Sequence, residues 1–522
     1  MSGAYDYVIV GAGSAGCVLA ARLTEDPDVR VAVLEAGGPD AAGEIRTPAA
    51  FPAVFKSSLD WDLLGEQEPG LDNRRLYLPR GRVLGGSSSI NAMIYVRGNR
   101  ADYDGWAAMG FDGWAYDDVL PYFKRSEDNE RGEDAFHAVG GPLGVSESRS
   151  MHPLVETMLK AARRAGHERN PDFNGARQEG VGRFQLTQRD GLRCSAADAF
   201  LHPAERRPNL DVLTDALALR IVFEGERAVG VDVARHGVIR ASREVIVSAG
   251  AYQSPVLLML SGLGPAADLA PLGIEVREDL PVGHNLQDHC MAQVNYLTDV
   301  PSLFLAVTPE NIALLQQEGR GPLSSNIPEA GGFMRSRAGL DAPDLEFHFA
   351  PSLFFDEGLT APADHGYCFG PVVIQPTSRG RVMLRAPLPD SKPRVLCNFL
   401  TTEEDRRTML DGLRMALEIA EQAPLRDAMR QPFSVPASAS DADLLAFARR
   451  AGQSVYHPTS TCAMGAVVDS ELRVLGTDGL RVVDASVMPT VTRGNTNAPT
   501  MMIAERAADL IRGRRPSEVA YA

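Results

Sequence analysis

The sequence predicts an α/β protein built on a nucleotide-binding fold. Three observations support this class: a β-α-β pattern near the N-terminus, a glycine-rich turn inside that pattern, and an acidic residue at the end of its second strand. Residues 7–10 and 31–34 are short, unbroken apolar runs, which are typical of parallel strands covered on both faces. Residues 14–23 lie between them and have the length and composition of a helix.

The turn after the first strand has the spacing of a dinucleotide-binding fingerprint. Gly11 permits the tight turn, Gly13 lets a pyrophosphate approach the backbone, and Gly16 lets the helix pack closely on the strand. The first helical turn begins at Ser14 and Ala15 and presents free amides, at the positive end of the helix dipole, to the phosphates. The sequence therefore predicts a bound dinucleotide.

Glu35 ends the second strand, just before Ala36. A carboxylate at this position accepts hydrogen bonds from the ribose diol of a dinucleotide. It fits FAD or NAD and disfavours a 2′-phosphate. The fingerprint by itself leaves FAD and NAD open.

The composition is that of a globular protein with an acidic surface. Of 522 residues, 44% are hydrophobic and 23% are charged, and 52 basic against 68 acidic side chains give a formal charge of −16. Nucleic acid and anionic lipid are disfavoured partners because both would be repelled. The six cysteines form no CxxC pair, so neither a zinc site nor a disulfide framework is expected. We expect a cytoplasmic protein, because we find neither a signal peptide nor an apolar stretch long enough to span a bilayer.

The rest of the chain predicts a second sheet and several helices. The alternating segments 345–349 and 381–384 indicate a sheet with one exposed face, and 210–214 and 228–234 resemble exposed antiparallel strands. The other predicted elements are strands at 245–247 and 480–483 and helices at 254–260, 402–422, 441–451 and 499–511.

This order of elements predicts a Rossmann-like domain that is interrupted by a substrate domain with a mostly antiparallel sheet. We expect residues 1–150, 190–300 and 452–522 to form the nucleotide-binding domain. Residues 151–189 and 301–451 are expected to form the substrate-binding domain.

Five longer motifs resemble the glucose–methanol–choline (GMC) oxidoreductase family. They lie at residues 81–98, 250–264, 282–289, 456–458 and 494–499, in the order that the family has them. Because the chain carries one dinucleotide fingerprint, the resemblance implies that FAD occupies it and that the protein does not depend on NAD. The implied activity is oxidation of an alcohol at its CH–OH group, as in the choline-dehydrogenase-like and alcohol-dehydrogenase branch.

The first of these motifs fits a cradle for the flavin. Small residues at Gly85, Gly86 and Ser87 let the backbone lie against a flat ring. Some family members link the flavin covalently to a histidine just before Asn91, but Ile90 stands there, so non-covalent FAD is expected. The full set of expected cofactor contacts is Gly11, Gly13, Ser14, Ala15, Gly16, Glu35, Ala36, Trp61, Arg82, Val83, Gly85, Gly86, Asn91, Ala92, Met93, Ile94, Ala218, Ala249, Gly250, Asp484, Ala485 and Thr496.

The resemblance implies two catalytic residues near the C-terminus. A hydroxyl proton is too weakly acidic to leave unaided, and histidine, which titrates near neutral pH, suits the role of base. His457 matches the family's catalytic histidine, and Asn495 matches the second position, where it would hold the substrate oxygen and aim the α-hydrogen at flavin N5. Asparagine cannot exchange protons, so proton abstraction should rest on His457 alone. His284 and His289 complete no set of metal ligands, and no metal is predicted.

The last helix should also act on the cofactor. Asn497 is the expected N-cap and Pro499 fits the first turn of the helix that follows. If the N-terminus of this helix faces the flavin, its dipole stabilises negative charge on the reduced ring.

A primary alcohol is the expected substrate, and oxygen, a quinone or a redox protein the expected electron acceptor. A quaternary ammonium substrate such as choline would need an acid or an aromatic cage, for which Trp61, Tyr367 and Phe354 are candidates. Hydroxynitrile lyases of the family tend to carry histidine at both catalytic positions, so Asn495 argues against a lyase. A photodecarboxylase and a non-catalytic FAD-binding protein are further alternatives. Oxidase or dehydrogenase, with a lean towards dehydrogenase, and the oligomeric state stay open.

Overall fold

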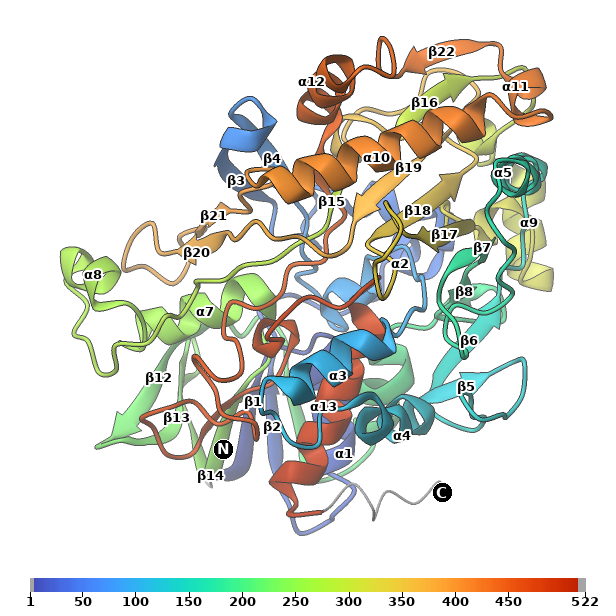
Figure 1. Ribbon diagram of the computed structural model, residues 1–522. Helices are drawn as coiled ribbons and strands as arrows, with labels where there is room; N and C mark the ends of the chain where they lie inside the picture. The colour runs from blue at the N-terminus through green and yellow to red at the C-terminus, as the bar shows by residue number, and fades with distance from the viewer. Residues whose placement is uncertain (1–3, 515–522) are drawn as a thin grey trace.

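The computed structural model describes residues 4–514 and contains two large sheets (Figure 1). The first sheet has seven strands in the order β11-β2-β1-β14-β13-β12, with β24 added beside β14. Neighbours among β11, β2, β1, β14 and β24 are parallel, whereas β13 and β12 extend the sheet as antiparallel strands. The strands are β1 (Tyr5–Val10), β2 (Val31–Leu34), β11 (Leu210–Leu213), β12 (Ala218–Glu224), β13 (Arg227–Val233), β14 (Gly237–Val247) and β24 (Leu480–Val482).

The predicted β-α-β unit is confirmed. Strand β1, helix α1 (Ser14–Leu23) and strand β2 follow one another, and nearly all their side chains are buried. Helix α13 (Asn497–Ile511) lies along α1, although it comes from the other end of the chain (Figure 1). One strand prediction is wrong: β11 pairs in parallel with β2, because it lies at the parallel edge of the sheet, not in an antiparallel hairpin. The antiparallel pairing predicted for 228–234 is confirmed in β13, but this strand is mostly buried and not exposed as expected.

The second sheet has eight strands and is antiparallel throughout. Its central order is β22-β16-β19-β18-β17-β7, and β15 joins β19 to β23. The strands are β7 (Gly180–Arg183), β15 (Cys290–Met291), β16 (Val294–Leu297), β17 (Ala330–Met334), β18 (Leu345–Ala350), β19 (Gly366–Val373), β22 (Gln431–Ser434) and β23 (Gln453–Ser454).

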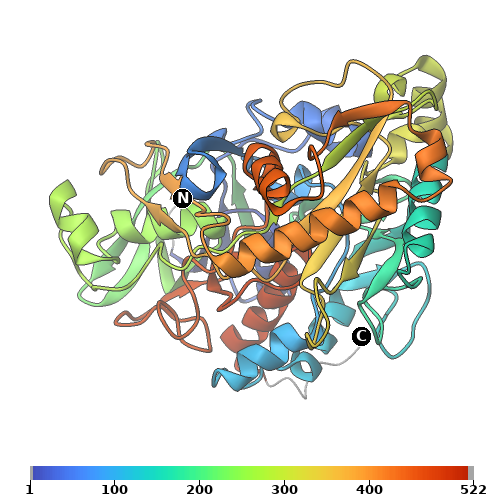
Figure 2. The same ribbon diagram turned by 45° about the horizontal axis from the view of Figure 1, so that its top comes forward.

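The second sheet has no exposed face at its centre, contrary to the expectation. Every residue of β18 and β19 is buried. Helix α10 (Glu403–Ala420) crosses β19 on one side (Figures 1 and 2), and α5 (Pro153–Arg164) contacts β17 and β18. The segment predicted at 381–384 is not part of this sheet, since β20 (Arg381–Met383) pairs only with β21 (Arg394–Leu396).

The remaining helices surround the two sheets. The predicted helices at 402–422 and 441–451 are α10 and α12, and the helix predicted at 254–260 begins earlier, at Gly250. The longer of these surrounding helices are α3 (Arg100–Ala108), α4 (Tyr116–Ser126), α7 (Gly250–Leu260), α9 (Pro309–Glu318) and α12 (Asp441–Ala451). In residues 4–514 no helix is both long enough and apolar enough to cross a membrane.

Strands β15, β16 and β23 belong to the second sheet, although they fall in ranges expected to form the nucleotide-binding domain. Pairing between strands therefore crosses the expected boundaries near residues 300 and 451. The division into domains stays a prediction.

Candidate active site

One large cavity runs from the glycine-rich turn to the second sheet. The space not filled by atoms is about 2130 Å³, the open mouth of the cavity included. At one end it is lined by residues of the first sheet, such as Gly11 and Glu35, and at the other by His348 and Ala350 of β18. The space suits an elongated cofactor together with a substrate.

The structure leaves no room for a side chain at two glycines of the fingerprint, Gly11 and Gly16. Gly11 has φ of 100°, and a Cβ atom on Gly16 would lie 1.9 Å from the carbonyl oxygen of Gly11. Gly86 has φ of 54°, and a Cβ atom there would lie 2.7 Å from the Cα atom of Gly13. The two glycine-rich segments are therefore in direct contact through their backbones, without a side chain between them, at the wall of the cavity.

Glu35 is buried at the end of β2, and both its oxygens accept backbone hydrogen bonds. Oε2 accepts from the amide of Ala12 at 2.9 Å, and Oε1 accepts from the amide of Gly37 at 2.8 Å. Burial raises the pKa of this carboxyl to about 7, against the opposing effect of these amides. Each carboxylate oxygen has a second lone pair, so the group can still accept from a ribose hydroxyl.

Asp484, just after the end of β24, also lines the cavity. Its Oδ2 accepts hydrogen bonds from Ser254 Oγ at 2.5 Å and from the amide of Gly250, the first residue of α7, at 2.9 Å. Burial raises the pKa of this carboxyl. The carboxylate therefore ties α7 to the end of β24 at the edge of the cavity.

Most of the residues expected to contact the cofactor line this cavity. Four of them are not part of its lining: Gly16, Arg82, Val83 and Gly85. Gly16 packs against Gly11, Val83 packs in a small apolar cluster, and the guanidinium of Arg82 lies over the Trp61 ring at 5.0 Å. The residues that line it as expected are Gly11, Gly13, Ser14, Ala15, Glu35, Ala36, Trp61, Gly86, Asn91, Ala92, Met93, Ile94, Ala218, Ala249, Gly250, Asp484, Ala485 and Thr496.

His457 and Asn495 also line the cavity, and their side chains meet. Nδ2 of Asn495 donates to Nε2 of His457 at 3.1 Å. On the other side of the ring, Nδ1 of His457 lies 3.0 Å from Nδ1 of His289, and the two rings meet edge to face. The Oδ1 atom of Asn495 is buried without a hydrogen-bond partner among the described residues, so an acceptor at the cavity wall is free for a ligand.

Asp288 holds both histidine-bearing segments in place. Its Oδ1 accepts from the backbone amides of His289 and His457, each at 2.8 Å, and its Oδ2 accepts from Ser454 Oγ at 2.5 Å. Burial raises the pKa of Asp288 to about 6. The loop before His457 is further fixed by Arg80, whose Nη2 donates to the carbonyl of Tyr456 at 2.8 Å.

The rings of His457 and His289 are held neutral. Burial, followed by the fields of His289, His348 and Arg80, lowers the pKa of His457 well below its usual value. Burial and the field of His348 lower the pKa of His289 to about 3. At neutral pH both rings are therefore uncharged, which is the form in which a histidine can accept a proton.

Several residues of the site were not expected from the sequence. The sequence predicts no role for His289 beside His457, and its place in the motif at 282–289 is the signal that could have found it. His348 and Gln293 sit in the second sheet region and carry no local signal at all. Tyr367, a candidate for an aromatic cage, instead stacks on Tyr296 within the second sheet, with ring centroids 5.5 Å apart.

Asn497 is not the N-cap of α13. Thr496 occupies the N-cap position without a side-chain hydrogen bond, and Asn497 is the first helical residue. The Asn497 side chain instead accepts from Ser14 Oγ at 2.7 Å and so links α13 to the start of α1. The N-terminus of α13 nevertheless faces the cavity, which Thr496, Asn497 and Thr500 line.

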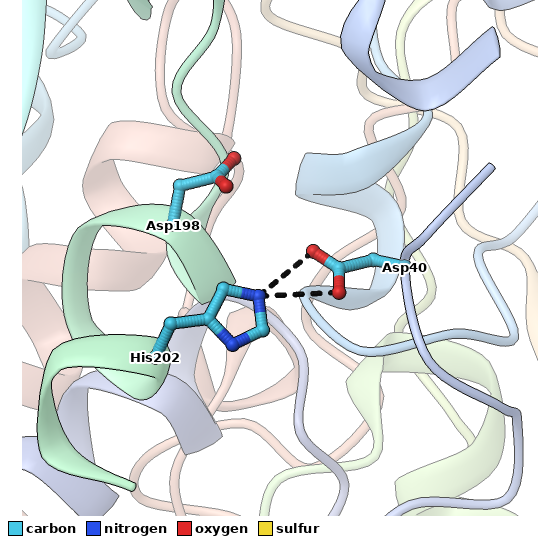
Figure 3. Close-up of side chains that lie close together, drawn as sticks. All are labelled: Asp40, Asp198 and His202. Carbon is cyan, nitrogen blue, oxygen red and sulfur yellow. Dashed lines mark hydrogen bonds and ion pairs between the residues drawn. The ribbon is translucent and has the colours of Figure 1, made fainter. Parts of the chain in front are cut away.

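Asp40, Asp198 and His202 lie together outside the cavity (Figure 3). His202 Nε2 lies 3.1 Å from both oxygens of Asp40, and its Nδ1 lies 2.9 Å from Glu205 Oε2. The hydrogen bond with Asp40 is the main cause that raises the pKa of His202 to about 9. A protonated imidazole between two carboxylates has no lone pair for a metal, so this group is an ion pair.

The fold and the site define a dinucleotide-binding oxidoreductase with a histidine at the cavity wall. Residues 5–291 and 376–504 match the two family models described as GMC oxidoreductase. The chain belongs to the GMC oxidoreductase family and is an FAD-dependent oxidoreductase that acts on CH–OH donors.

Relatives and solved structures agree with this assignment. An uncharacterized GMC-type oxidoreductase of Mycobacterium tuberculosis is 46% identical over 97% of this chain and 99% of its own length. An oxygen-dependent choline dehydrogenase of Sinorhizobium fredii is 44% identical over 98% and 96%. The crystal structure of pyridoxine 4-oxidase from Mesorbium loti superimposes with a TM-score of 0.89 at 34% identity, covering 97% of this chain and 98% of that one.

Proposed function

We propose that this protein oxidises a primary alcohol to the aldehyde, with His457 as the base and Asn495 as the residue that orients the alcohol. One observation carries the proposal: the 3.1 Å contact between His457 Nε2 and Asn495 Nδ2, at the wall of the cavity that begins at the dinucleotide fingerprint. When bound, FAD supplies the acceptor for the hydride that leaves the α-carbon.

The residues present fit FAD. The fingerprint turn with Gly13 and Ser14 would hold the pyrophosphate, Glu35 the ribose, and the Gly86–Asn91 stretch and Thr496 the ring system. Ile90 lines the cavity and offers no nucleophilic atom, which supports non-covalent binding. We assign these roles together with the other expected cofactor contacts that line the cavity.

The hydrogen-bond pattern supports His457 Nε2 as the basic atom. Because Asn495 Nδ2 can only donate, Nε2 accepts, and the proton of the neutral ring is on Nδ1. Nδ1 then donates to His289 Nδ1, which must itself be unprotonated. An alcohol hydroxyl that replaced the Asn495 donor at Nε2 would transfer its proton to this atom, while Nδ2 of Asn495 donated a hydrogen bond to the substrate oxygen and held it in place.

The lining of the cavity supports different roles for the two sheets. We propose that the first sheet carries the cofactor and that the second sheet, with His348 and Ala350 of β18, contributes to the substrate wall. The boundaries expected from the sequence would need to shift so that β15, β16 and β23 count with the second sheet. Oxygen, a quinone or a redox protein would take the electrons afterwards, and we propose the cytoplasm as the location.

Anaerobic addition of primary alcohols to the FAD-loaded protein tests the proposal. Bleaching of the oxidised flavin spectrum, with formation of one aldehyde per flavin, is the expected result. A lyase, a photodecarboxylase or an FAD-storing protein would leave the spectrum unchanged in the dark. Repeating the assay with oxygen alone and with an artificial acceptor separates an oxidase from a dehydrogenase.

A further inference from the structure

Arg193 is a buried cation beside the cavity that forms no ion pair with an acid in the described part of the chain, residues 4–514. It is 5% exposed and ends the short strand β10 (Leu192–Arg193). Nε donates to the carbonyl of Ile45 at 2.8 Å, and Nη1 donates to the carbonyl of Ser88 at 3.1 Å and to Asn91 Oδ1 at 2.7 Å. All three acceptors are neutral, and Nη2 has no hydrogen-bond partner among residues 4–514.

The carboxylate of Asp198 acts on Arg193 through its charge but forms no hydrogen bond or ion pair with it among residues 4–514. The Oδ2 atom of Asp198 accepts from the amide and the hydroxyl of Ser195, at 3.0 and 2.8 Å, and the carboxylate lies beside the His202–Asp40 pair (Figure 3). Burial lowers the pKa of Arg193 to about 9, so the group still carries its charge at neutral pH.

Another buried arginine, Arg97, has the acidic partner that Arg193 lacks among the described residues. Arg97 is 1% exposed and pairs with the buried Glu127 at 2.6 Å. An unpaired buried charge costs several kcal/mol of desolvation. A cost of that size at the edge of a cofactor cavity calls for a functional reason.

The guanidinium also decides how Asn91 is oriented. Arginine has only donors, so the atom of Asn91 that faces it must be the oxygen. The amide of Met93, which has φ of 58°, donates to the same oxygen at 3.0 Å. The Nδ2 group of Asn91 is left without a protein acceptor among the described residues, and Asn91 lines the cavity.

We propose that Arg193 is a positioning residue that holds the Asn91 amide as a donor to the bound flavin and places an unpaired positive charge behind it, so that the flavin is easier to reduce. Reduction adds negative charge to the ring system. In a site shielded from water, a fixed donor and a nearby cation stabilise that charge more than they stabilise the oxidised ring. This inference rests on the proposed binding of FAD at this cavity and not on the identity of the alcohol.

The test is the reduction potential of bound FAD, measured by equilibration with a reference dye in the absence of any alcohol. Asn91→Asp is the sharpest variant, because it supplies the missing counter-ion and removes the donor while leaving Arg193 in place. Arg193→Gln removes the charge but keeps a donor for Asn91 Oδ1. Both variants should shift the two-electron equilibrium towards oxidised flavin by at least tenfold, which corresponds to about 30 mV.

Arg207→Met is the matched control. Arg207 is partly buried and also donates only to neutral acceptors, the carbonyl of Ala21 and Thr24 Oγ1, but it does not line the cavity. It should lower thermal stability without changing the potential.

An unchanged potential in Asn91→Asp would overturn the inference, and so would an equal fall in Arg207→Met. A variant that loses part of its FAD is judged on the flavin-loaded fraction. If the wild-type protein bound no FAD, the proposed function itself would fail, which the flavin spectrum reports before any potential is measured.

Discussion

The carboxamide of Asn495 donates to the imidazole of His457 across 3.1 Å, although 38 residues separate the two in the chain. The contact fixes both partners, because the amide donor makes Nε2 the acceptor of the ring. It also leaves Asn495 Oδ1 free at the cavity wall. A base for the hydroxyl proton, His457 Nε2, and a donor for the substrate oxygen, Asn495 Nδ2, therefore lie side by side.

Removing the imidazole of His457 should slow the reduction of the flavin by an alcohol strongly while leaving FAD bound. We expect His457→Ala to retain FAD but to slow anaerobic flavin reduction by an alcohol roughly 10²–10⁴-fold, the usual contribution of a general base. Stopped-flow absorbance measures this rate. His236→Ala, at an exposed histidine, is the control and should reduce like the wild type. A normal rate in His457→Ala would reject this residue as the base.

Removing the carboxamide of Asn495 should slow flavin reduction less than removing the imidazole of His457. Asn495→Ala loses a hydrogen bond to the substrate oxygen but keeps the base, so a reduction rate roughly 10- to 100-fold slower is expected, or about 1.4–2.8 kcal/mol. The same stopped-flow assay measures it. A wild-type rate would remove Asn495 from the site.

The contact between the two glycine-rich segments predicts a defect in cofactor binding. Gly86→Ala places a Cβ atom 2.7 Å from Gly13 Cα in a left-handed backbone, so the segments must separate where FAD would lie. We expect at least a tenfold weaker Kd for FAD, about 1.4 kcal/mol, by fluorescence titration. Gly105→Ala, in α3 with open space around it, should bind FAD normally. Equal affinities in both variants would contradict this account of the turn.

The side chain at position 90 predicts a dissociable flavin. Ile90 has no atom that can bond to the ring, so acid precipitation of the protein should leave all of the yellow colour in the supernatant. Absorbance of pellet and supernatant measures this. Flavin retained in the denatured pellet would show a covalent link at another residue.

The buried neutral His289 predicts acid sensitivity. Its folded pKa of about 3 lies below the ordinary value of 6.5, so its contribution to stability is present above pH 6.5 and is lost as the pH falls towards 3. Between pH 6.5 and 5 the loss is about 2 kcal/mol, at about 1.4 kcal/mol per unit. His289→Gln should therefore lose less free energy of unfolding between pH 7 and pH 5 than the wild type does, as measured by urea titration. A similar loss in both proteins would show that His289 does not titrate over this range.

The sequence alone determined the β-α-β unit, the helices α10 and α12 and the class of the protein. Those features depend on short-range patterns: apolar runs, helical periodicity and glycines at fixed spacing, each of which acts over a few residues. The motifs also named His457 and Asn495, but not the distance between them.

Only the tertiary structure decided which distant residues meet. The sequence predicts an antiparallel β11, an exposed face on β18 and Asn497 as an N-cap. The structure instead has a parallel β11, a fully buried β18 and a hydrogen bond that Ser14 Oγ donates to Asn497, because each of these features depends on a partner far along the chain. The same holds for Arg193, which no pattern in the sequence marks as buried. Its burial against Asn91 is set by the packing of segments about a hundred residues apart, because local propensity carries no information about which neighbours remove a charge from water.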